Sequence, residues 1–348
     1  MATTQDDYLA EGYFRAGHTV RRTRYVFVEG HFYSTVWSRV PLQAYALRKS
    51  QRKLLRRVRR DYAVTVGPYR PRVDQDRLYD RYQSTHPLEV AAEVREVLGY
   101  EHPSLPFHTH CLRLEDADGD LVAFSCFDRG SASLASLFGA YEPDRARESL
   151  GFATMLLEMA HGAAEGLAYY YPGYCVPGLA PFAYKLRLPA LEGRSYVDAD
   201  WAPMPEVLAR PLPKQLVGDA LAYLEELLLG HEIACRPLVM PMAENYHALN
   251  APTGPLPHAQ MLAIESPVPL GELFVGYDPA NAVYEVWIAA PTVDLREEQP
   301  EAPWLEEFGP DADLRLYAWR IPVLGVEDPA ELLKYFQPGS LLTRLLTG

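Results

Sequence analysis

Residues 48–62 read RKSQRKLLRRVRRDY, a stretch whose side chains could bind phosphate. Eight lysines and arginines lie between Arg48 and Arg60, with no acidic residue among them. Cationic groups at this density bind a nucleic-acid backbone and release its condensed counterions, which makes the binding strongly salt-dependent. The stretch is therefore a candidate phosphate-binding surface. The alternative is a charged helix face that only water covers.

The same stretch is predicted to be a helix over about residues 50–61. Ser50 is a suitable N-cap, and Leu54, Leu55 and Val58 form a narrow apolar stripe. The arginines on the outer side repel one another, since each like-charged pair four residues apart costs roughly 0.2–0.5 kcal/mol. A helix with this repulsion gains most when a polyanion covers it.

Charge is distributed unevenly along the 348 residues, whose formal net charge is -13. Residues 1–72 carry a net charge of +10, residues 73–200 carry -10 and residues 201–348 carry -13. Salt screens exposed charges beyond about 10 Å, so these regional differences act locally. We expect three segments with these boundaries: a basic N-terminal segment, a core, and an acidic C-terminal α+β extension.

The composition is that of an ordinary globular protein, long enough for two or three domains. No apolar run approaches the roughly 18 residues of a membrane-spanning helix, and the acidic start MATTQDDYLAEG is unlike a signal peptide. We therefore expect a cytoplasmic protein with no membrane partner. The cysteines form no C-x-x-C pair, so neither a metal site nor a disulfide framework is expected. They are Cys111, Cys126, Cys175 and Cys235.

The middle of the chain predicts a mixed sheet with one crossover helix. Residues 108–128 alternate about an Asp-Gly turn, which indicates a hairpin. A strand at 133–143, a helix at 144–167 with Asp144 near its N-cap, and a strand at 168–174 follow. This order gives a right-handed crossover on an otherwise antiparallel sheet. The expected fold class is α+β, mixed α/β, and the pattern matches the core of the GNAT (acyl-CoA N-acyltransferase-like) fold.

Weaker patterns predict the remaining elements. Residues 25–37 resemble a hairpin turned at Glu29-Gly30, and residues 73–100 look helical. The loop-rich stretch 193–213 is a credible boundary. A small α+β unit follows it, with a helix at 214–230, a hairpin at 271–290 and a short helix at 328–336 capped by Asp328.

Three blocks of residues resemble the arginyl-tRNA-protein transferase family, including its bacterial leucyl-transferring branch. Their order and spacing agree with the family over about residues 9–193. The blocks are Lys49-Ser50-Gln51-Arg52-Lys53 with Arg56-Arg57; Tyr141-Glu142-Pro143-Asp144 through Ser149-Leu150-Gly151; and Tyr169-Tyr170-Tyr171-Pro172-Gly173-Tyr174, then Ala183-Tyr184-Lys185 and Leu191-Glu192.

The resemblance implies a GNAT-like transferase that moves an amino acid from aminoacyl-tRNA to an N-terminal or other amine of a protein or peptide, which tags the acceptor for degradation. Arginine is favoured as the amino acid, and leucine is the alternative. No cofactor is implied beyond aminoacyl-tRNA as co-substrate. The implied partners are that tRNA and a protein or peptide acceptor, and no DNA.

Two departures from the family stand out. The stretch at 26–36 has no cysteine where the family carries a cysteine cluster, so any metal or iron–sulfur function of that cluster is absent. Residues 200–348 match no part of the family, so acceptor recognition can differ.

The resemblance assigns the basic helix to tRNA and the neighbouring sheet to the chemistry. Tyr174 and Tyr184 leave the strand end where a GNAT sheet opens, and can stack on the terminal adenosine, worth roughly 1–3 kcal/mol per base. The positions implied to contact tRNA are Lys49, Gln51, Arg52, Lys53, Arg56 and Arg57.

Aminolysis of an activated ester needs a positioned amine, a proton acceptor and support for the oxyanion. Asp128 can bind the acceptor's ammonium group or take its proton, or be only a strand-end cap. Lys185 can support the oxyanion or grip the terminal phosphate, or be a surface lysine. Further implied substrate contacts are Ser149, Gly151, Tyr171 and Glu192. Gly151 can also be a close-packing position, and a surface role for Glu192 stays open.

Two other functions remain open from the sequence. A GNAT acyltransferase that uses acyl-CoA wants R/Q-x-x-G-x-G/A at a helix start, where backbone amides hold a pyrophosphate. Glu148 puts a carboxylate at the first position of that motif, which disfavours acyl-CoA. The other alternative is a non-catalytic relative that binds tRNA or a partner protein.

Overall fold

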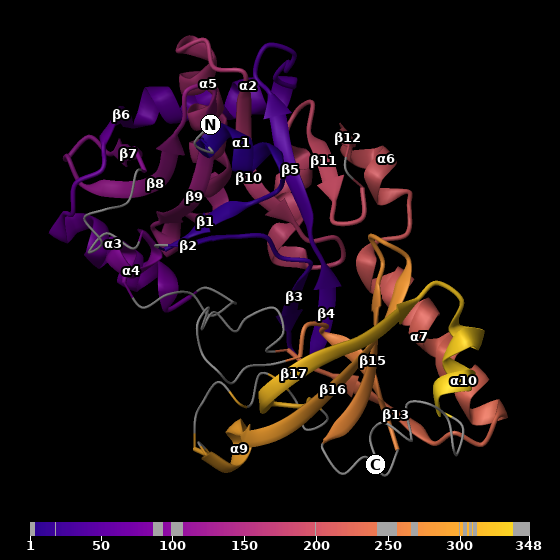
Figure 1. The fold of residues 1–348 in the computed structure, drawn as a ribbon. Coiled ribbons are helices and arrows are strands. Elements are labelled where there is room, and N and C mark those ends of the chain that lie inside the picture. Colours follow the sequence, from indigo (N-terminus) through magenta and orange to yellow (C-terminus); the bar gives the residue numbers. More distant parts are fainter. Residues whose placement is uncertain are drawn as a thin grey trace. The chain divides into compact units, whose positions relative to one another are not determined.

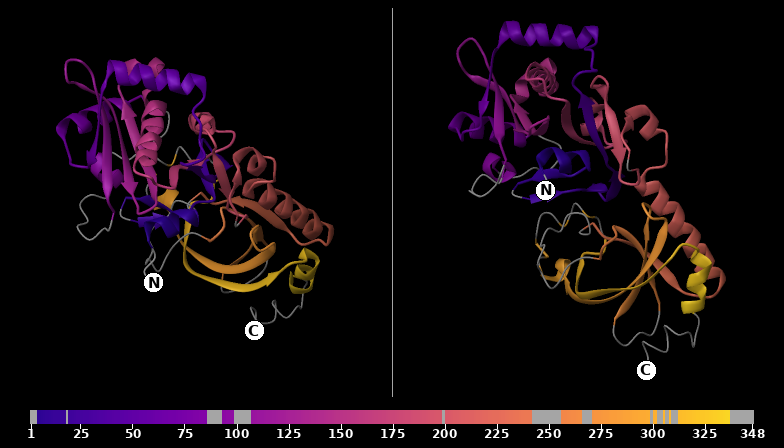
Figure 2. Two further views of the ribbon diagram at one scale, coloured as in Figure 1. Left: turned by 90° about the horizontal axis from the view of Figure 1, so that it is seen from above. Right: turned by 45° about the horizontal axis from the view of Figure 1, so that its top comes forward.

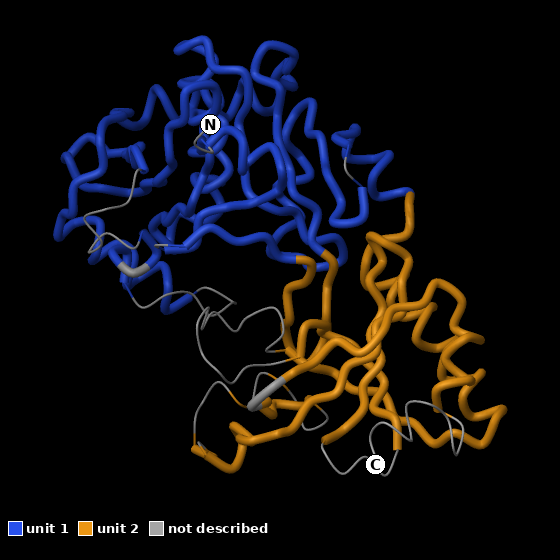
Figure 3. Tube along the Cα trace, viewed as in Figure 1, with its two compact units in different colours: residues 1–23, 35–209 blue, residues 24–34, 210–348 orange. Residues whose placement is uncertain are grey.

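The computed structural model describes residues 4–17, 19–85, 93–98, 107–198, 200–241, 256–265, 271–298, 300–301, 305, 308 and 312–336. It divides into two compact units, residues 1–23 with 35–209 and residues 24–34 with 210–348 (Figure 3). This differs from the three expected segments. The basic helix and its flanking strands join the same sheet as the core, whereas residues 24–34 fold with the C-terminal part.

The first unit is built on an eight-stranded sheet with the order β12-β11-β5-β10-β9-β8-β7-β6 (Figure 1). Neighbouring strands are antiparallel except β9 and β10, which run parallel. The bounds are β5 (Val36–Pro41), β6 (Ala63–Pro68), β7 (Thr109–Glu115), β8 (Leu121–Arg129), β9 (Ser133–Tyr141), β10 (Tyr169–Cys175), β11 (Glu192–Ser195) and β12 (Ala202–Pro203).

The parallel pair is joined by helix α5 (Leu150–Ala164), so the expected crossover and the GNAT-like class are confirmed. Helices cover both faces of the sheet. On β8, Phe124 and Cys126 pack in the cluster that includes α3 (Val73–Gln83) and α4 (Val94–Leu98). The alternate side chain Phe127 contacts His161 of α5, because successive residues of a strand point to opposite faces.

The basic helix forms as predicted, with a different start. Helix α2 spans Lys49–Asp61, and its N-cap is Arg48, not Ser50. The side chain of Gln51, three residues after the cap, accepts a 2.8 Å hydrogen bond from the backbone N–H of Arg48. This contact satisfies a backbone donor at the helix start, the task a cap normally performs.

Helix α5 begins later than predicted. Asp144 lies in a separate 3-10 segment, η1 (Pro143–Glu148), and Ser149 is the N-cap of α5. The break occurs because Ser149 has left-handed backbone angles, φ 59° and ψ 39°, which interrupt a right-handed helix. The pattern of periodic apolar residues did not reveal this turn.

Smaller elements complete the first unit. They are α1 (Gln5–Ala10), β1 (Phe14–Ala16), β2 (Thr19–Arg21), η2 (Ala180–Arg187) and α6 (Met204–Leu208). Of the expected helical region 73–100, the structure describes α3 and α4, and the stretches 86–92 and 99–100 lie outside the described residues.

The second unit is an antiparallel five-stranded sheet with one long helix, which confirms the expected α+β character of the C-terminal part. Leu224 and Leu228 of α7 pack with Val275 and Val286 of the sheet. The bounds are β3 (Tyr25–Val28), β4 (His31–Ser34), α7 (Pro213–Gly230), β13 (Cys235–Val239), β14 (Gln260–Ile264), β15 (Glu272–Asp278), β16 (Val283–Asp294), α9 (Leu295–Glu298), β17 (Arg315–Val326), η4 (Pro329–Leu332) and α10 (Leu333–Phe336).

The hairpin predicted at 25–37 is present as β3 and β4 and ends at Ser34. Its turn is at Glu29-Gly30 as predicted, and both residues have positive φ. None of the helices within the described ranges is both long and apolar enough to cross a membrane.

Candidate active site

The sheet of the first unit opens between β9 and β10. The two strands pair only at residues 133–135 and 169–171. Beyond these pairs, β9 follows β8 up to Tyr141, while β10 follows β5 through a register shift between Tyr170 and Gly173. We call this region the β9–β10 opening. In open α/β sheets, ligands bind beyond the carboxyl ends of strands that separate in this way.

Three tyrosines gather at the β9–β10 opening. The rings of Tyr82 on α3 and Tyr141 on β9 meet edge to face, 5.1 Å between centroids. Tyr184 of η2 is 39% exposed, and the partial burial of its ring, with a smaller electrostatic effect of Tyr141, raises its pKa to about 12. Gly151 belongs to the same region, since a Cβ there would lie 3.2 Å from the ring of Tyr141. Its lack of a side chain thus has a packing reason.

A buried carboxylate lies on α5 beside the last paired residues of β10. Glu158 is fully buried, and the hydroxyl of Tyr170 donates a 2.7 Å hydrogen bond to it. Burial raises the pKa of Glu158 to about 7, although hydroxyls of Ser125, Tyr170 and Ser136 oppose the rise. Glu158 also interacts electrostatically with Tyr184. Sequence reasoning missed this residue, whose only signal is a lone acid in the apolar run LGFATMLLEMA.

The structure does not leave Asp128 free to bind an ammonium group. Its side chain is 1% exposed, and Arg15 donates to both of its oxygens at 2.9 and 3.0 Å. The hydroxyl of Thr109 donates a third hydrogen bond at 2.7 Å. Arg15 also donates to the carbonyls of Gly17 and Leu98, so the pair ties β1, α4 and β8 together. Because the carboxylate is buried and already paired, Asp128 fits the structural role that the sequence had left open beside the catalytic one. The sequence did not reveal its partner, since Arg15 lies 113 residues away.

Lys185 and Tyr174 lie at the end of β10. The ammonium group of Lys185 donates a 3.1 Å hydrogen bond to the backbone carbonyl of Tyr174, and burial lowers its pKa. The ring of Tyr174 packs between Phe14 and Phe182, at centroid distances of 5.4 and 5.7 Å. Tyr174 therefore is already stacked within the fold, and the ammonium group of Lys185 lies over the rings of Tyr174 and Phe182, 5.6 and 5.4 Å from their centroids.

The side chains of Tyr171 and Glu192 already have partners within the fold. Tyr171 is 2% exposed and packs against Trp37 and Trp201, so the expected substrate contact is corrected to a core position. Glu192 accepts a 2.7 Å hydrogen bond from Arg39, whose guanidinium group lies 4.2 Å from the ring centroid of Trp201. The tyrosines of β10 alternate between the faces of the strand, so neighbours in sequence separate in space.

The basic helix α2 is fastened beside the opening at two points. The Gln51 side chain donates a 2.9 Å hydrogen bond to the carbonyl of Arg187, at the end of η2. Arg57 donates to the carbonyl of Glu148, and the hydroxyl of Tyr62 donates to the Glu148 carboxylate at 2.6 Å. Helix α2 packs directly on α5 (Figure 2). The helix thus adjoins both η2, which carries Tyr184, and the start of α5.

Exposure divides the expected tRNA contacts into two groups. Gln51 is 4% exposed and Arg57 is half-buried, so these two side chains serve the fold. The exposed members of the set are Lys49, Arg52, Lys53 and Arg56, joined by Arg48, Arg59 and Arg60. We call these seven residues the α2 cationic face. Within the described ranges, the one acidic residue that forms an ion pair with this face is Asp61, which pairs with Arg60.

The described residues include no group of three histidine, cysteine or acidic side chains placed to hold a metal ion. The four cysteines are free thiols, and Cys111, Cys126 and Cys175 are buried. Burial raises the pKa of the Cys126 thiol and of the Cys175 thiol, which keeps both protonated and unreactive.

Comparison with known proteins shows the family of this chain. Residues 74–193 match the family model of the arginine-tRNA-protein transferase C terminus. The aspartate/glutamate leucyltransferase of Gluconobacter oxydans is 30% identical over 169 residues, which is 47% of this chain and 68% of that protein. The chain belongs to the arginine-tRNA-protein transferase family. It is an aminoacyltransferase that depends on aminoacyl-tRNA.

Other relatives of this family carry the same name. The aspartate/glutamate leucyltransferase of Caulobacter vibrioides is 33% identical over 44% of this chain and 58% of its own length. That of Gluconacetobacter diazotrophicus is 27% identical over 53% of this chain and 70% of its own length. These relatives place the chain in the bacterial leucyl-transferring branch. They give no support to arginine, which the family resemblance had favoured.

Solved structures with a similar fold include L-PGS from Bacillus licheniformis, with a TM-score of 0.32 and 14% identity over 49% of this chain and 50% of that chain. FemX has a TM-score of 0.32 and 10% identity over 50% of this chain and 60% of its own. The GNAT-like class of the first unit follows from its own strand order and from the β9–α5–β10 crossover.

Replacing Arg15 by Met is expected to lower the free energy of unfolding by about 3–5 kcal/mol, because it leaves the buried carboxylate of Asp128 without its cation. Guanidinium-induced unfolding at pH 7 measures the loss. The double variant Arg15→Met/Asp128→Asn should recover part of it. A loss below about 1 kcal/mol in the single variant would mean that the pair contributes little.

Replacing Glu158 by Gln is expected to stabilise the protein increasingly as pH rises. The unfolded chain has the ordinary glutamate pKa of 4.5 and the folded protein about 7, so the stability that the protonated acid supplies is complete below pH 4.5 and lost as pH rises through 7. Between pH 5 and pH 8, unfolding measurements should show Gln gaining about 2–3 kcal/mol over Glu. A difference that is independent of pH would contradict the raised pKa.

Proposed function

We propose that this protein transfers leucine from leucyl-tRNA to the N-terminal amine of a protein that begins with aspartate or glutamate. The observation that carries the proposal is the attachment of α2 beside the β9–β10 opening, through Gln51 to Arg187 and through Arg57 and Tyr62 to Glu148. This attachment sets a cationic surface next to the place where the sheet can admit a ligand. The names of the relatives support leucine and acidic acceptors.

The α2 cationic face suits the acceptor stem of a tRNA. Proteins recognise A-form RNA mostly by its shape and by contacts to phosphates and 2′-hydroxyls, and lysine and arginine side chains on one helix face supply such contacts. Arg52 and Arg56 are exposed on this face. They remain available because the inward-turned Gln51 and Arg57 hold the helix in place.

The β9–β10 opening suits the terminal adenosine and its ester. The rings of Tyr82, Tyr141 and Tyr184 provide surfaces on which a base can stack. The first backbone N–H groups of α5, near Gly151, have no partner within the helix and point toward negative charge. Together with the ammonium group of Lys185 they can stabilise the oxyanion that forms at the ester carbonyl.

Glu158 and Tyr170 supply a route for the proton. The acceptor's ammonium group must lose a proton before its nitrogen attacks the ester carbonyl, and a carboxylate with a pKa near 7 suits that task at neutral pH. Glu158 and Tyr170 are both fully buried, so the Glu158 carboxylate takes the proton through the Tyr170 hydroxyl only when the bound acceptor amine reaches that hydroxyl. The new C–N bond forms, the bond from the carbonyl carbon to the ribose 3′-oxygen breaks, and the proton passes to that oxygen.

Incubating the protein with tRNA charged with labelled leucine, and with a peptide that begins with Glu, should move the label to the peptide. Labelled arginyl-tRNA should give much less transfer. An N-acetylated peptide is the control, since it has no free amine. The proposal fails if leucine is not transferred, and equal transfer of arginine would refute the choice of amino acid.

The double variant Arg52→Glu/Arg56→Glu should lower tRNA affinity at least tenfold and abolish transfer, because it reverses two phosphate-binding charges that make no ion pair in the described part of the fold. Arg236→Glu/Lys334→Glu is the matched control. It changes the net charge equally at exposed positions of the second unit. Affinity for tRNA and circular dichroism are measured for both, and equal losses of affinity would exclude a specific role for α2.

A further inference from the structure

The first unit also contains a cavity whose lining residues differ from those assigned to the candidate active site. It measures about 920 Å³ and is lined by α3 from Arg72 to Arg81, by the β7–β8 turn and by residues 142–145. We call it the α3 groove. Its floor includes the apolar side chains of Leu121 and Val122, and the exposed Val73 is part of its wall. A volume of this size holds a small ligand or the end of a peptide.

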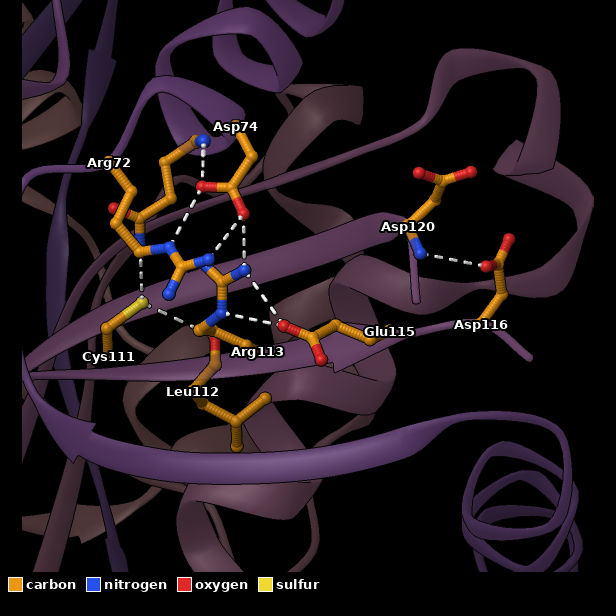
Figure 4. Close-up of polar contacts among 9 residues, drawn as sticks. Arg72, Asp74, Cys111, Leu112, Arg113, Glu115, Asp116 and Asp120 are labelled. Atoms are coloured by element: carbon orange, nitrogen blue, oxygen red, sulfur yellow. Dashed lines mark hydrogen bonds and ion pairs between the residues drawn. The ribbon is translucent and has the colours of Figure 1, made fainter. Parts of the chain in front are cut away.

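Ion pairs between different elements hold the walls of the α3 groove. Arg113 of β7 donates to Asp74 of α3 at 2.6 Å, and Arg72 donates to the same carboxylate at 3.2 Å (Figure 4). Arg145 donates to Asp116 of the β7–β8 turn at 2.9 Å. These contacts neutralise four charged residues of the lining, Arg72, Asp74, Asp116 and Arg145, and fix the shape of the groove before any ligand arrives.

A fourth ion pair links the groove to residues that neighbour the β9–β10 opening. Arg81 of α3 pairs with Glu142, which directly follows β9. The next residue on α3 is Tyr82 and the residue before Glu142 is Tyr141, and their rings are in contact at the opening. Arg81 and Glu142, which line the α3 groove, are therefore each next in the chain to a tyrosine of the candidate active site.

Three charged side chains that line the α3 groove take no part in these ion pairs. In the part of the chain that the structure describes, the side chains of Arg77, Asp120 and Asp144 form no ion pair, and all three are exposed. Arg77 comes from α3, and the two acids come from the opposite wall. A ligand with only negative groups would meet two carboxylates, and a ligand with only positive groups would leave Arg77 unpaired. The leftover charges favour a ligand that carries both an amine and a carboxylate.

We infer that the α3 groove binds the N-terminus of the acidic acceptor, with Arg77 holding the side-chain carboxylate of its first residue and Asp120 and Asp144 attracting its ammonium group. The inference rests on the proposed function, because that reaction requires such an acceptor next to the opening. The inference adds the residues that recognise the acceptor, which are Arg77, Asp120 and Asp144. Arg81 and Glu142 of the groove are the chain neighbours of Tyr82 and Tyr141, so the acceptor's amine would leave Asp120 and Asp144 past this ion pair to reach the opening.

Direct binding tests the α3 groove without tRNA. A fluorescently labelled peptide that begins with Glu is titrated with the full chain, and anisotropy gives the Kd. Arg77→Glu and Asp120→Lys should each raise the Kd at least tenfold, as should N-acetylation of the peptide. The matched controls are Arg70→Glu and Asp118→Lys, which change the same charges at exposed neighbouring positions outside the lining. They should leave the Kd within twofold of the unmodified protein.

Reversing the charge of Arg77 should reverse the preference for the first residue of the peptide, a result that a damaged fold would not produce. Arg77→Glu should bind a peptide that begins with Lys better than one that begins with Glu, reversing the preference of the unmodified protein. In transfer assays, Arg77→Glu should raise the KM for the Glu peptide while the KM for leucyl-tRNA stays unchanged.

The outcomes separate the groove from the reaction. If leucine is transferred but Arg77→Glu and Arg70→Glu have the same peptide Kd, the groove assignment is overturned and the proposed function stands. If no leucine is transferred but peptide binding depends on Arg77 and Asp120, the function falls and the groove stands. Absence of peptide binding by the unmodified protein at millimolar concentration would also overturn the groove assignment.

Discussion

The short pairing between β9 and β10 is the constraint on which the candidate site depends. Beyond Ala135 and Tyr171 the two strands follow different neighbours, since β10 must continue along β5. Gly173, with φ 86°, lies where pairing resumes, and its carbonyl accepts a hydrogen bond from Ser38. The same crossover brings the start of α5 to this end of the sheet. One backbone arrangement thereby supplies an opening, the start of a helix and a buried acid beside it.

Electrostatics in the first unit follow a simple division between the interior and the surface. Arginines that lie inside are matched by carboxylates or carbonyls, as Arg15 is by Asp128 and Arg57 is by the carbonyl of Glu148. A buried charge needs this compensation because it has lost its water. The α2 cationic face has little such compensation and needs little, because water screens it. The α2 cationic face therefore carries positive charges that remain available to bind an anionic partner.

Much of the fold could be predicted from local patterns. The Asp-Gly turn indicated the β7–β8 hairpin, and the spacing of apolar residues indicated α2, α7 and the crossover helix. The predictions that were wrong concern features that depend on backbone angles or on partners distant in the sequence. Ser149 adopts left-handed angles that delay the start of α5, and Arg15 neutralises Asp128 from 113 residues away. Neither effect leaves a periodic pattern in the sequence.

By itself the sequence determined the family, the fold class, the basic helix and the chemistry to be expected, because those follow from residue types and from spacing within one element. Only the tertiary structure decided which members of each motif face a ligand. Gln51 and Arg57 turn inward, Tyr171 joins the core, and Glu158 is buried against Tyr170. The physical reason is that exposure and pKa depend on neighbours brought together by packing, and those neighbours are far apart along the chain.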